Sequence, residues 1–503
     1  MEDKVSKLIK GTLLLMAAAL VTKVLGFVHR IILADMAGEE GVGLYMMTFP
    51  ALMLAITVTQ LGLPIAISKY VSEATANKNE QDVRKILSVS LWITGSLALI
   101  LTPCLFFAAP FISSTLLNDE RTLIPFIAVL PIIPIAAFSA VVRGYFMGRQ
   151  QMGVTAAGSV IEQTIRIVLL IAAVGFLSSK GAAYAAGGAM LAAVIGELCS
   201  LLFLLFMFKI KKEKANVRSE KTFIYTANKL LKIALPSAGS RFVGSVAWFL
   251  EPVIVMKCLV FTGMTATAVT ADYGLLTGFI LPVLLLPSFI TVSLSMALVP
   301  SISEAKALSQ ESAVMHRITQ ALRLSAVTGT LCCLILFLEG DTILQLLYGS
   351  DKGLGLLKLM ALLFIFYYYQ GPLHAVLQAF EAAGKAMVNS IIGSVIKLTA
   401  MAGFMIYLED IKGAAIGLAI GTAAVTFLHF KTVKKLCHLP LPIGQYAAIL
   451  LVALCCWLIH TGISSMEAPV RIMIMIIIFC FLASRVQLIQ REDWAFFKVF
   501  KKN

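Results

Sequence analysis

Long apolar stretches recur along the whole chain, and each is long enough to cross a lipid bilayer as a helix. At a rise of 1.5 Å per residue, roughly 20 apolar residues span the hydrocarbon core. The 503 residues are 59% hydrophobic and 14% charged, whereas soluble domains carry about 25% charged residues. The stretches far exceed the roughly 10 residues of a barrel strand, and backbone groups in lipid must be satisfied internally. The sequence therefore predicts an all-α polytopic membrane protein.

Hydropathy indicates about 14 transmembrane helices. The polar stretch near residues 209–232 is too short for a separate soluble domain. Lysines before the first span suggest a signal peptide, but the apolar pattern continues past Ala17–Ala19, so we expect an uncleaved first helix. The predicted spans lie near residues 11–34, 43–68, 85–109, 123–147, 154–178, 182–208, 233–257, 271–298, 320–338, 355–380, 386–408, 412–430, 443–462 and 470–489.

The loops between these spans alternate in charge. Lysine and arginine gather in every second loop, for example in 209–232, and the intervening loops are mainly acidic. The positive-inside rule then places both termini in the cytoplasm, with the protein in the cell membrane. The same loops account for the net charge of +14, so we expect no nucleic-acid partner.

Short motifs recur in the same order and at nearly equal spacing, which predicts an internal repeat. Three pairs match: Val71–Ala74 with Ile302–Ala305, Gly158–Ile161 with Gly393–Ile396, and Gly181–Ala183 with Gly413–Ala415. The second pair places Glu162 opposite Lys397. Both copies start on the same side, so two parallel six-helix repeats are expected. The predicted parts are an N-terminal lobe (1–208), a basic cytoplasmic linker (209–232), a C-terminal lobe (233–437), and two extra helices with a cytoplasmic tail (438–503).

Charged side chains lie inside the apolar spans, where a charge costs about 2.5 to 3.5 kcal/mol on insertion scales. Such residues usually face a polar cavity or a partner. Cations outnumber acids, which favours an anionic ligand such as a phosphate or pyrophosphate. The candidate substrate-binding residues are Lys23, His29, Arg30, Arg143, Arg166, Arg241 and Lys397, and the candidate ion-pairing or coupling acids are Glu162 and Glu251.

Several of these residues also have a structural explanation. Glu162 and Arg166 are four residues apart on one helical face and can form a structural ion pair. Arg143, near a span end, can extend to the membrane surface. Glu251 can pair with Arg241 or titrate. Gly413, Gly417 and Gly421 form a face of small residues that suits close helix packing.

Motifs for catalysis and metal binding are missing from the sequence. We find no Walker motif, no HExxH, no GxSxG and no CxxC pair among the nine cysteines. We therefore expect neither an enzyme nor a metal or cofactor site. Without a cofactor, the energy for any transport would come from the membrane potential or from a monovalent ion.

Several segments carry a family resemblance. Thr22–Phe27, Leu63–Ala66 followed by Ser72–Ala74, and Leu235–Ser237 resemble the polysaccharide-exporter branch of the multidrug/oligosaccharidyl-lipid/polysaccharide (MOP) flippase superfamily, and its sporulation proteins in particular. The lipid II flippases are similar but more distant. The flippases carry arginine at the position of Lys23, and arginine followed by an acid where this chain has His29 and Arg30.

The resemblance implies alternating-access transport of an undecaprenyl-pyrophosphate-linked, lipid II-like peptidoglycan precursor, for synthesis of the spore cortex. Its implied partners are that anionic lipid, the membrane lipids and cell-wall synthesis enzymes. Two alternatives stay open. A cation-coupled multidrug antiporter of the same superfamily predicts an acidic cavity, and a non-transporting scaffold for cortex enzymes predicts that the linker matters more than the intramembrane charges.

Overall fold

The computed structural model describes residues 2–211, 222–437, 443–490 and 493. This part of the chain is almost entirely helical and contains no strand, so the predicted all-α fold is confirmed. The chain divides into two compact units, Met1–Gly278 and Phe279–Asn503. The predicted lobes 1–208 and 233–437 stay predictions, and part of the predicted linker and of the C-terminal tail lies outside the described residues.

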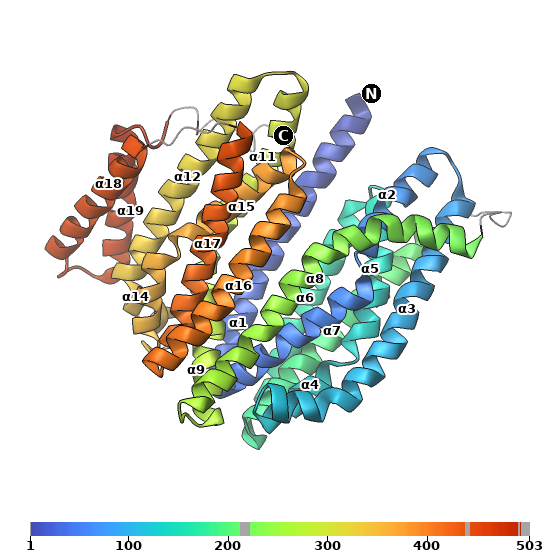
Figure 1. Ribbon diagram of the computed structural model, residues 1–503, viewed down its shortest axis with the longest axis horizontal. Helices are drawn as coiled ribbons and strands as arrows, with labels where there is room; N and C mark the ends of the chain where they lie inside the picture. Colours follow the sequence, from blue (N-terminus) through green and yellow to red (C-terminus); the bar gives the residue numbers. More distant parts are fainter. Residues whose placement is uncertain (1, 212–221, 438–442, 491–492, 494–503) are drawn as a thin grey trace. The chain divides into compact units, whose positions relative to one another are not determined.

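The described part of the first unit contains nine α-helices, drawn from blue to green in Figure 1. The long α1 contacts α6, α7, α8 and α9, and α6 packs against α7. The helices are α1 (Glu2–Gln60), α2 (Leu63–Ala76), α3 (Glu80–Phe111), α4 (Leu123–Val129), α5 (Ile132–Gly148), α6 (Met152–Leu177), α7 (Ala182–Lys211), α8 (Phe223–Phe261) and α9 (Ala266–Gly274).

The second unit contains one closely packed helix pair and one group of three contacting helices. Helices α16 and α17 run side by side (Figure 1), and α12 contacts both appended helices, α18 and α19. The helices are α10 (Leu281–Leu285), α11 (Phe289–Ala307), α12 (Glu311–Leu338), α13 (Gly340–Tyr348), α14 (Leu354–Leu363), α15 (Ile365–Ala379), α16 (Ala383–Leu408), α17 (Lys412–Cys437), α18 (Ile443–Gly462) and α19 (Ala468–Arg485).

Eleven helices of the described chain are long and apolar enough to cross a membrane, or twelve if the bent pair Leu354–Leu363 and Ile365–Ala379 is one span. One of the eleven, Leu20–Ala76, includes most of the first predicted span and all of the second. Its helix α1 is interrupted at Gly38, whose φ of 66° and ψ of −178° are not helical and suit glycine. Ala447–Gly462 is apolar but shorter. The predicted count of 14 therefore stays a prediction.

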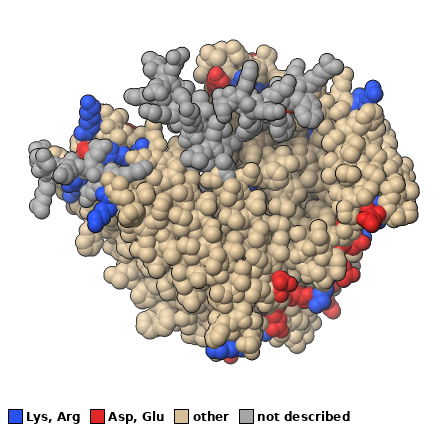
Figure 2. Space-filling model, turned by 180° about the vertical axis from the view of Figure 1, so that it is seen from behind, with Lys and Arg blue, Asp and Glu red and all other residues tan. Residues whose placement is uncertain are grey.

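The surface of the helices fits a lipid environment. Large apolar side chains of α3, such as Trp92, Leu99 and Phe107, are 67%, 76% and 80% exposed. The face drawn in Figure 2 is covered mostly by uncharged side chains. Such surface would be unfavourable in water but suits contact with hydrocarbon.

Helix boundaries confirm the internal repeat. Helix α6 (Met152–Leu177) and helix α16 (Ala383–Leu408) have the same length, so one constant spacing along the chain relates both of their ends. Left-handed residues recur at this same spacing, which shows that the turns repeat as well: Lys78 with Ser309, Asn118 with Gly349, and Gln150 with Glu381.

This spacing corrects one detail of the sequence analysis. The spacing between Gly158–Ile161 and Gly393–Ile396 is about one helical turn longer than the spacing between α6 and α16. The equivalence of Glu162 with Lys397, which followed from that motif match, was therefore wrong. When Met152 is aligned with Ala383, Lys397 corresponds to Arg166. Short motifs of small and β-branched residues recur by chance at turn spacing, so they do not fix a register.

Hydrogen bonds of Asp119 and its partner Arg121 connect three segments of the first unit. Asp119 is 5% exposed and lies in the turn before α4. Its Oδ2 accepts hydrogen bonds from Arg121 Nη2 at 2.8 Å and from Thr270 Oγ1 of α9 at 2.7 Å. Arg121 also donates to Glu40 of α1 at 3.2 Å. Burial opposes ionisation of Asp119, but these hydrogen bonds and the charge of Arg121 hold its pKa below the usual 3.8.

We expect Asp119 to make the protein acid-sensitive. Because its pKa is lower in the folded state, its contribution to stability is present above the unfolded-state pKa and is lost as pH falls through the folded-state pKa. Asp119→Asn should lower the thermal midpoint at pH 7, at a cost of about 1 to 3 kcal/mol, and flatten its fall between about pH 5 and pH 2. Thermal unfolding in detergent measures both.

The neighbouring acid provides the control for this experiment. Glu120 is exposed, so Glu120→Gln should leave the midpoint and its pH profile unchanged. An Asp119→Asn profile that is parallel to the wild-type profile would show that this carboxylate is not the acid-sensitive group.

Candidate functional site

A cluster of charged and hydroxyl side chains lies among α5, α6 and α7 in the first unit, with Arg143 of α5 at its centre. Arg143 Nη2 donates to Glu162 Oε2 at 3.0 Å and to Ser200 Oγ at 3.0 Å. Its Nη1 donates to Ser159 Oγ at 2.7 Å, and its Nε donates to Ser139 Oγ at 3.1 Å. All three nitrogens of the guanidinium are therefore engaged within the cluster.

Two acids complete the cluster. Glu162 accepts a second charge-assisted hydrogen bond, from Arg166 Nη2 to its Oε1 at 2.6 Å. Glu197 of α7, 8% exposed, lies 3.8 Å from Arg143 Nη2. The predicted pair of Glu162 and Arg166 is thus confirmed. Arg143 is not directed away from the bundle but is held in it, because three helices supply partners that an isolated span lacks.

The cluster continues towards α1 through Arg166. His29 of α1 is 5% exposed and lies within electrostatic range of Arg166 and Arg30. Its ring is 6.2 Å from that of Tyr45. Two buried nitrogens, His29 Nε2 and Arg166 Nε, have no hydrogen-bond partner among the described residues. Buried polar atoms are normally satisfied, so this side of the cluster can accept a further polar or anionic group.

The remaining candidates lie outside the cluster. Lys23 and Arg241 are exposed, and neither forms an ion pair with another described residue. The pairing of Arg241 with Glu251 that the sequence left open stays a prediction. Glu251 is buried and within electrostatic range of Tyr273. Lys397 belongs to the second unit, where it lies against Gly421.

Sequence reasoning missed the hydroxyl partners of Arg143. Ser139 is four residues before Arg143 on the same helix, and this spacing was a usable signal. Ser159 and Ser200 lie on other helices, at separations of 16 and 57 residues from Arg143. Nothing local in the sequence indicates that they converge.

Comparison with known proteins identifies the family. The family model described as polysaccharide biosynthesis protein matches residues 8–306, more than half of the chain. The chain belongs to this family. It is 45% identical over 464 residues to stage V sporulation protein B of Bacillus subtilis (strain 168), covering 90% of this chain and 89% of that protein. The resemblance to the sporulation proteins of the polysaccharide-exporter branch is confirmed.

Lipid II flippases are related in both sequence and fold. The chain is 26% identical over 471 residues to the lipid II flippase MurJ of the same organism, covering 86% of this chain and 83% of that protein. A solved structure of lipid II flippase MurJ in an inward closed conformation matches with a TM-score of 0.75 and 16% identity, covering 94% and 98% of the two chains. The chain is therefore a multi-pass membrane protein that shares its fold with lipid II flippase MurJ.

Proposed function

We propose that this member of the polysaccharide biosynthesis family moves an undecaprenyl-pyrophosphate-linked, lipid II-like peptidoglycan precursor across the cytoplasmic membrane by alternating access. It would serve synthesis of the spore cortex. The observation that carries the proposal is the 45% identity with stage V sporulation protein B along nearly the full length of both chains. The relation to lipid II flippases supports the class of substrate.

The geometry of the first unit supports an anionic headgroup. Arg166 and His29 each keep one buried nitrogen without a partner among the described residues. Arg143, in contrast, uses all of its nitrogens within the cluster. We infer that Arg166, Arg30 and His29 contribute to binding of the pyrophosphate, and that Arg143 positions Glu162 and Arg166. Lys23, Arg241 and Lys397 are proposed as further cations along the path of the headgroup.

The proposal extends to energy coupling and orientation. Transport would use no cofactor and would be driven by the membrane potential or by a monovalent ion, with Glu162 and Glu251 as coupling acids. Both termini would lie in the cytoplasm, as the loop charges predict. The transported lipid and the membrane lipids are the proposed ligands, and cell-wall synthesis enzymes are proposed as protein partners.

Removal of two exposed cations tests the mechanism. Lys23→Ala combined with Arg241→Ala should reduce transport by about 100-fold, because each charge-assisted bond to a phosphate contributes roughly 1.5 to 3 kcal/mol. Stability should not change, since neither side chain pairs with a described residue. The measurement is complementation of cortex formation in a Bacillus subtilis strain that lacks stage V sporulation protein B, at matched protein level.

The matched control is Lys209→Ala with Lys257→Ala, which removes the same charge from two other exposed positions. It should complement fully. Normal cortex in the Lys23→Ala, Arg241→Ala strain would remove these cations from the mechanism. If charge reversal at these two positions were harmless while changes in residues 209–232 abolished cortex formation, the scaffold alternative would replace transport.

A further inference from the structure

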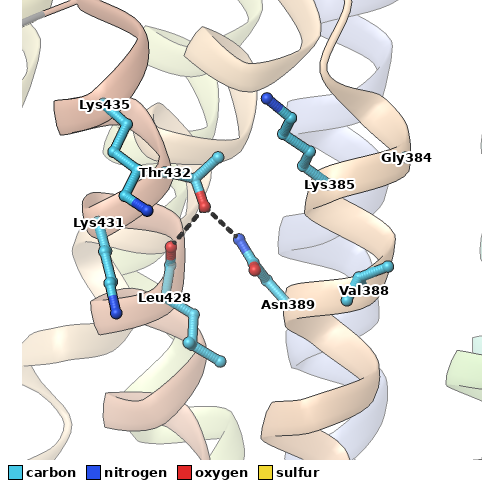
Figure 3. Close-up of a pocket in the computed structure, with 8 residues that line it drawn as sticks. All are labelled: Gly384, Lys385, Val388, Asn389, Leu428, Lys431, Thr432 and Lys435. Carbon is cyan, nitrogen blue, oxygen red and sulfur yellow. Dashed lines mark hydrogen bonds between the residues drawn. The ribbon is translucent and has the colours of Figure 1, made fainter.

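A basic pocket of about 460 Å³ opens between α16 and α17 in the second unit (Figure 3). Lys385, near the start of α16, points towards α17, which contributes Lys431 and Lys435. The eight described residues that line the pocket include no acid: Gly384, Lys385, Val388, Asn389, Leu428, Lys431, Thr432 and Lys435.

The three ammonium groups have no neutralising partner in the described chain. None of these lysines forms an ion pair with a described acid. Three like charges around one cavity repel one another, and an anion placed between them would remove that repulsion and gain attraction to all three. The pocket therefore favours a ligand of negative charge. At the spacing of the internal repeat, the equivalent of Lys385 in the first unit is Val154, so the repeat does not require a lysine there.

The floor of the pocket is polar and held in place. Asn389 is 8% exposed, and its Nδ2 donates to Thr432 Oγ1 at 3.0 Å. The Thr432 hydroxyl donates to the Leu428 carbonyl at 2.8 Å. In addition, no side chain caps the N-terminus of α16, so the amides of its first turn and its positive dipole end remain available near Lys385. The lysines and the uncapped helix amides match the chemistry of a phosphate, while the Asn389–Thr432 pair fixes the shape of the floor with its own donors engaged.

An apolar strip leads away from the pocket along α16. Val388 lines the pocket, and Val388, Ile392 and Val395 lie on one face of the helix at 49%, 42% and 57% exposure. Spacings of four and three residues keep their side chains in a row. A phosphate group at the lysines with acyl chains along this strip would use both features, whereas a free phosphate would use only the first.

We propose that this pocket binds the phosphate headgroup of an anionic phospholipid from the leaflet that adjoins the start of α16. The positive-inside pattern predicts that this is the cytoplasmic leaflet. The site is separate from the cluster around Arg143 and does not depend on which lipid the protein transports. Its ligand is a component of the surrounding bilayer that docks where α16 and α17 meet.

The experiment measures binding of phosphatidylglycerol to the full-length protein in detergent by native mass spectrometry, with phosphatidylcholine and inorganic phosphate as the other probes. Lys431→Gln should weaken phosphatidylglycerol binding about fivefold, as expected for one lysine at an anionic headgroup. The triple change of Lys385, Lys431 and Lys435 to Gln should weaken it by about 100-fold. The matched control, Lys434→Gln, alters an exposed lysine of the same helix that does not line the pocket, and should change binding by less than about twofold.

Three outcomes would overturn the proposal. Equal losses for Lys431→Gln and Lys434→Gln would show a diffuse basic surface rather than a site. Equal retention of phosphatidylcholine would show that the headgroup charge is not recognised. Inorganic phosphate that competes as well as phosphatidylglycerol would assign the pocket to a soluble phosphate. Unchanged thermal midpoints of the lipid-free variants would establish that the losses come from binding and not from misfolding.

Discussion

Replacing Arg143 with Met is expected to destabilise the first unit by about 3 kcal/mol, because it leaves the buried Glu197 and the partly buried Glu162 without their shared cation. Glu162 would keep Arg166, but Glu197 would lose the cation that lies 3.8 Å away. The hydroxyls of Ser139, Ser159 and Ser200 would each lose a charge-assisted hydrogen bond. Thermal unfolding of the purified protein should show a midpoint that is lower by several degrees.

Removing the opposing charge as well should restore part of this stability. The combined variant Arg143→Met, Glu197→Gln removes the acid that Arg143→Met leaves without a cation, and we expect it to recover about half of the loss, since an unpaired buried charge costs more than a missing pair. Arg166→Met serves as the comparison, because Glu162 retains its bond from Arg143 and the cost should be about 1 kcal/mol. A wild-type midpoint for Arg143→Met would show that the cluster does not stabilise the fold.

Gly417→Ala is expected to separate α17 from α16, at a cost of about 3 kcal/mol or more. A Cβ at Gly417 would lie 2.5 Å from both the backbone nitrogen and the Cα of Met401, and 2.3 Å from its Cγ. The Cγ could move by a change of rotamer, but the backbone of α16 cannot. The helices would have to shift apart along most of their contact, since Gly413 and Gly421 on the same face of α17 also touch α16.

A second glycine in the same helix pair makes the matched control. A Cβ at Gly403 of α16 would meet nothing within 4 Å, so Gly403→Ala should be neutral or stabilising by up to about 1 kcal/mol through helix propensity. Both variants add one methyl group within an apolar helix, and only its surroundings differ. Equal thermal midpoints for the two variants, or a lower midpoint for Gly403→Ala, would contradict close packing at Gly417.

Sequence reasoning succeeded where the determining interactions are local. The spacing of four residues between Glu162 and Arg166 predicted their pair, and the same spacing between Gly413, Gly417 and Gly421 predicted the contact face of α17. Both follow from the period of one helix, which any span must obey. The repeat was also visible in sequence, although short motifs placed Lys397 one turn away from its true equivalent, Arg166.

The sequence did not predict contacts between helices that are far apart along the chain. The separation of 57 residues between Arg143 and Ser200, and of 151 residues between Asp119 and Thr270, carries no periodic signal. Nor did the sequence alone indicate that Lys385 of α16 would share a pocket with Lys431 and Lys435 of α17. Each of these arrangements depends on which faces of two helices meet.

Taken alone, the sequence determined that this chain is a helical membrane protein with two related halves and a surplus of cations inside its apolar spans. These properties follow from hydropathy and helix period, because lipid forces each span to satisfy its own backbone. Only the tertiary structure decided which cations are held by acids and hydroxyls, as Arg143 is, and which keep donors available, as Arg166 does. The physical reason is that helices in lipid associate through shape and polar contacts between faces far apart in the chain, and no single helix encodes its neighbour.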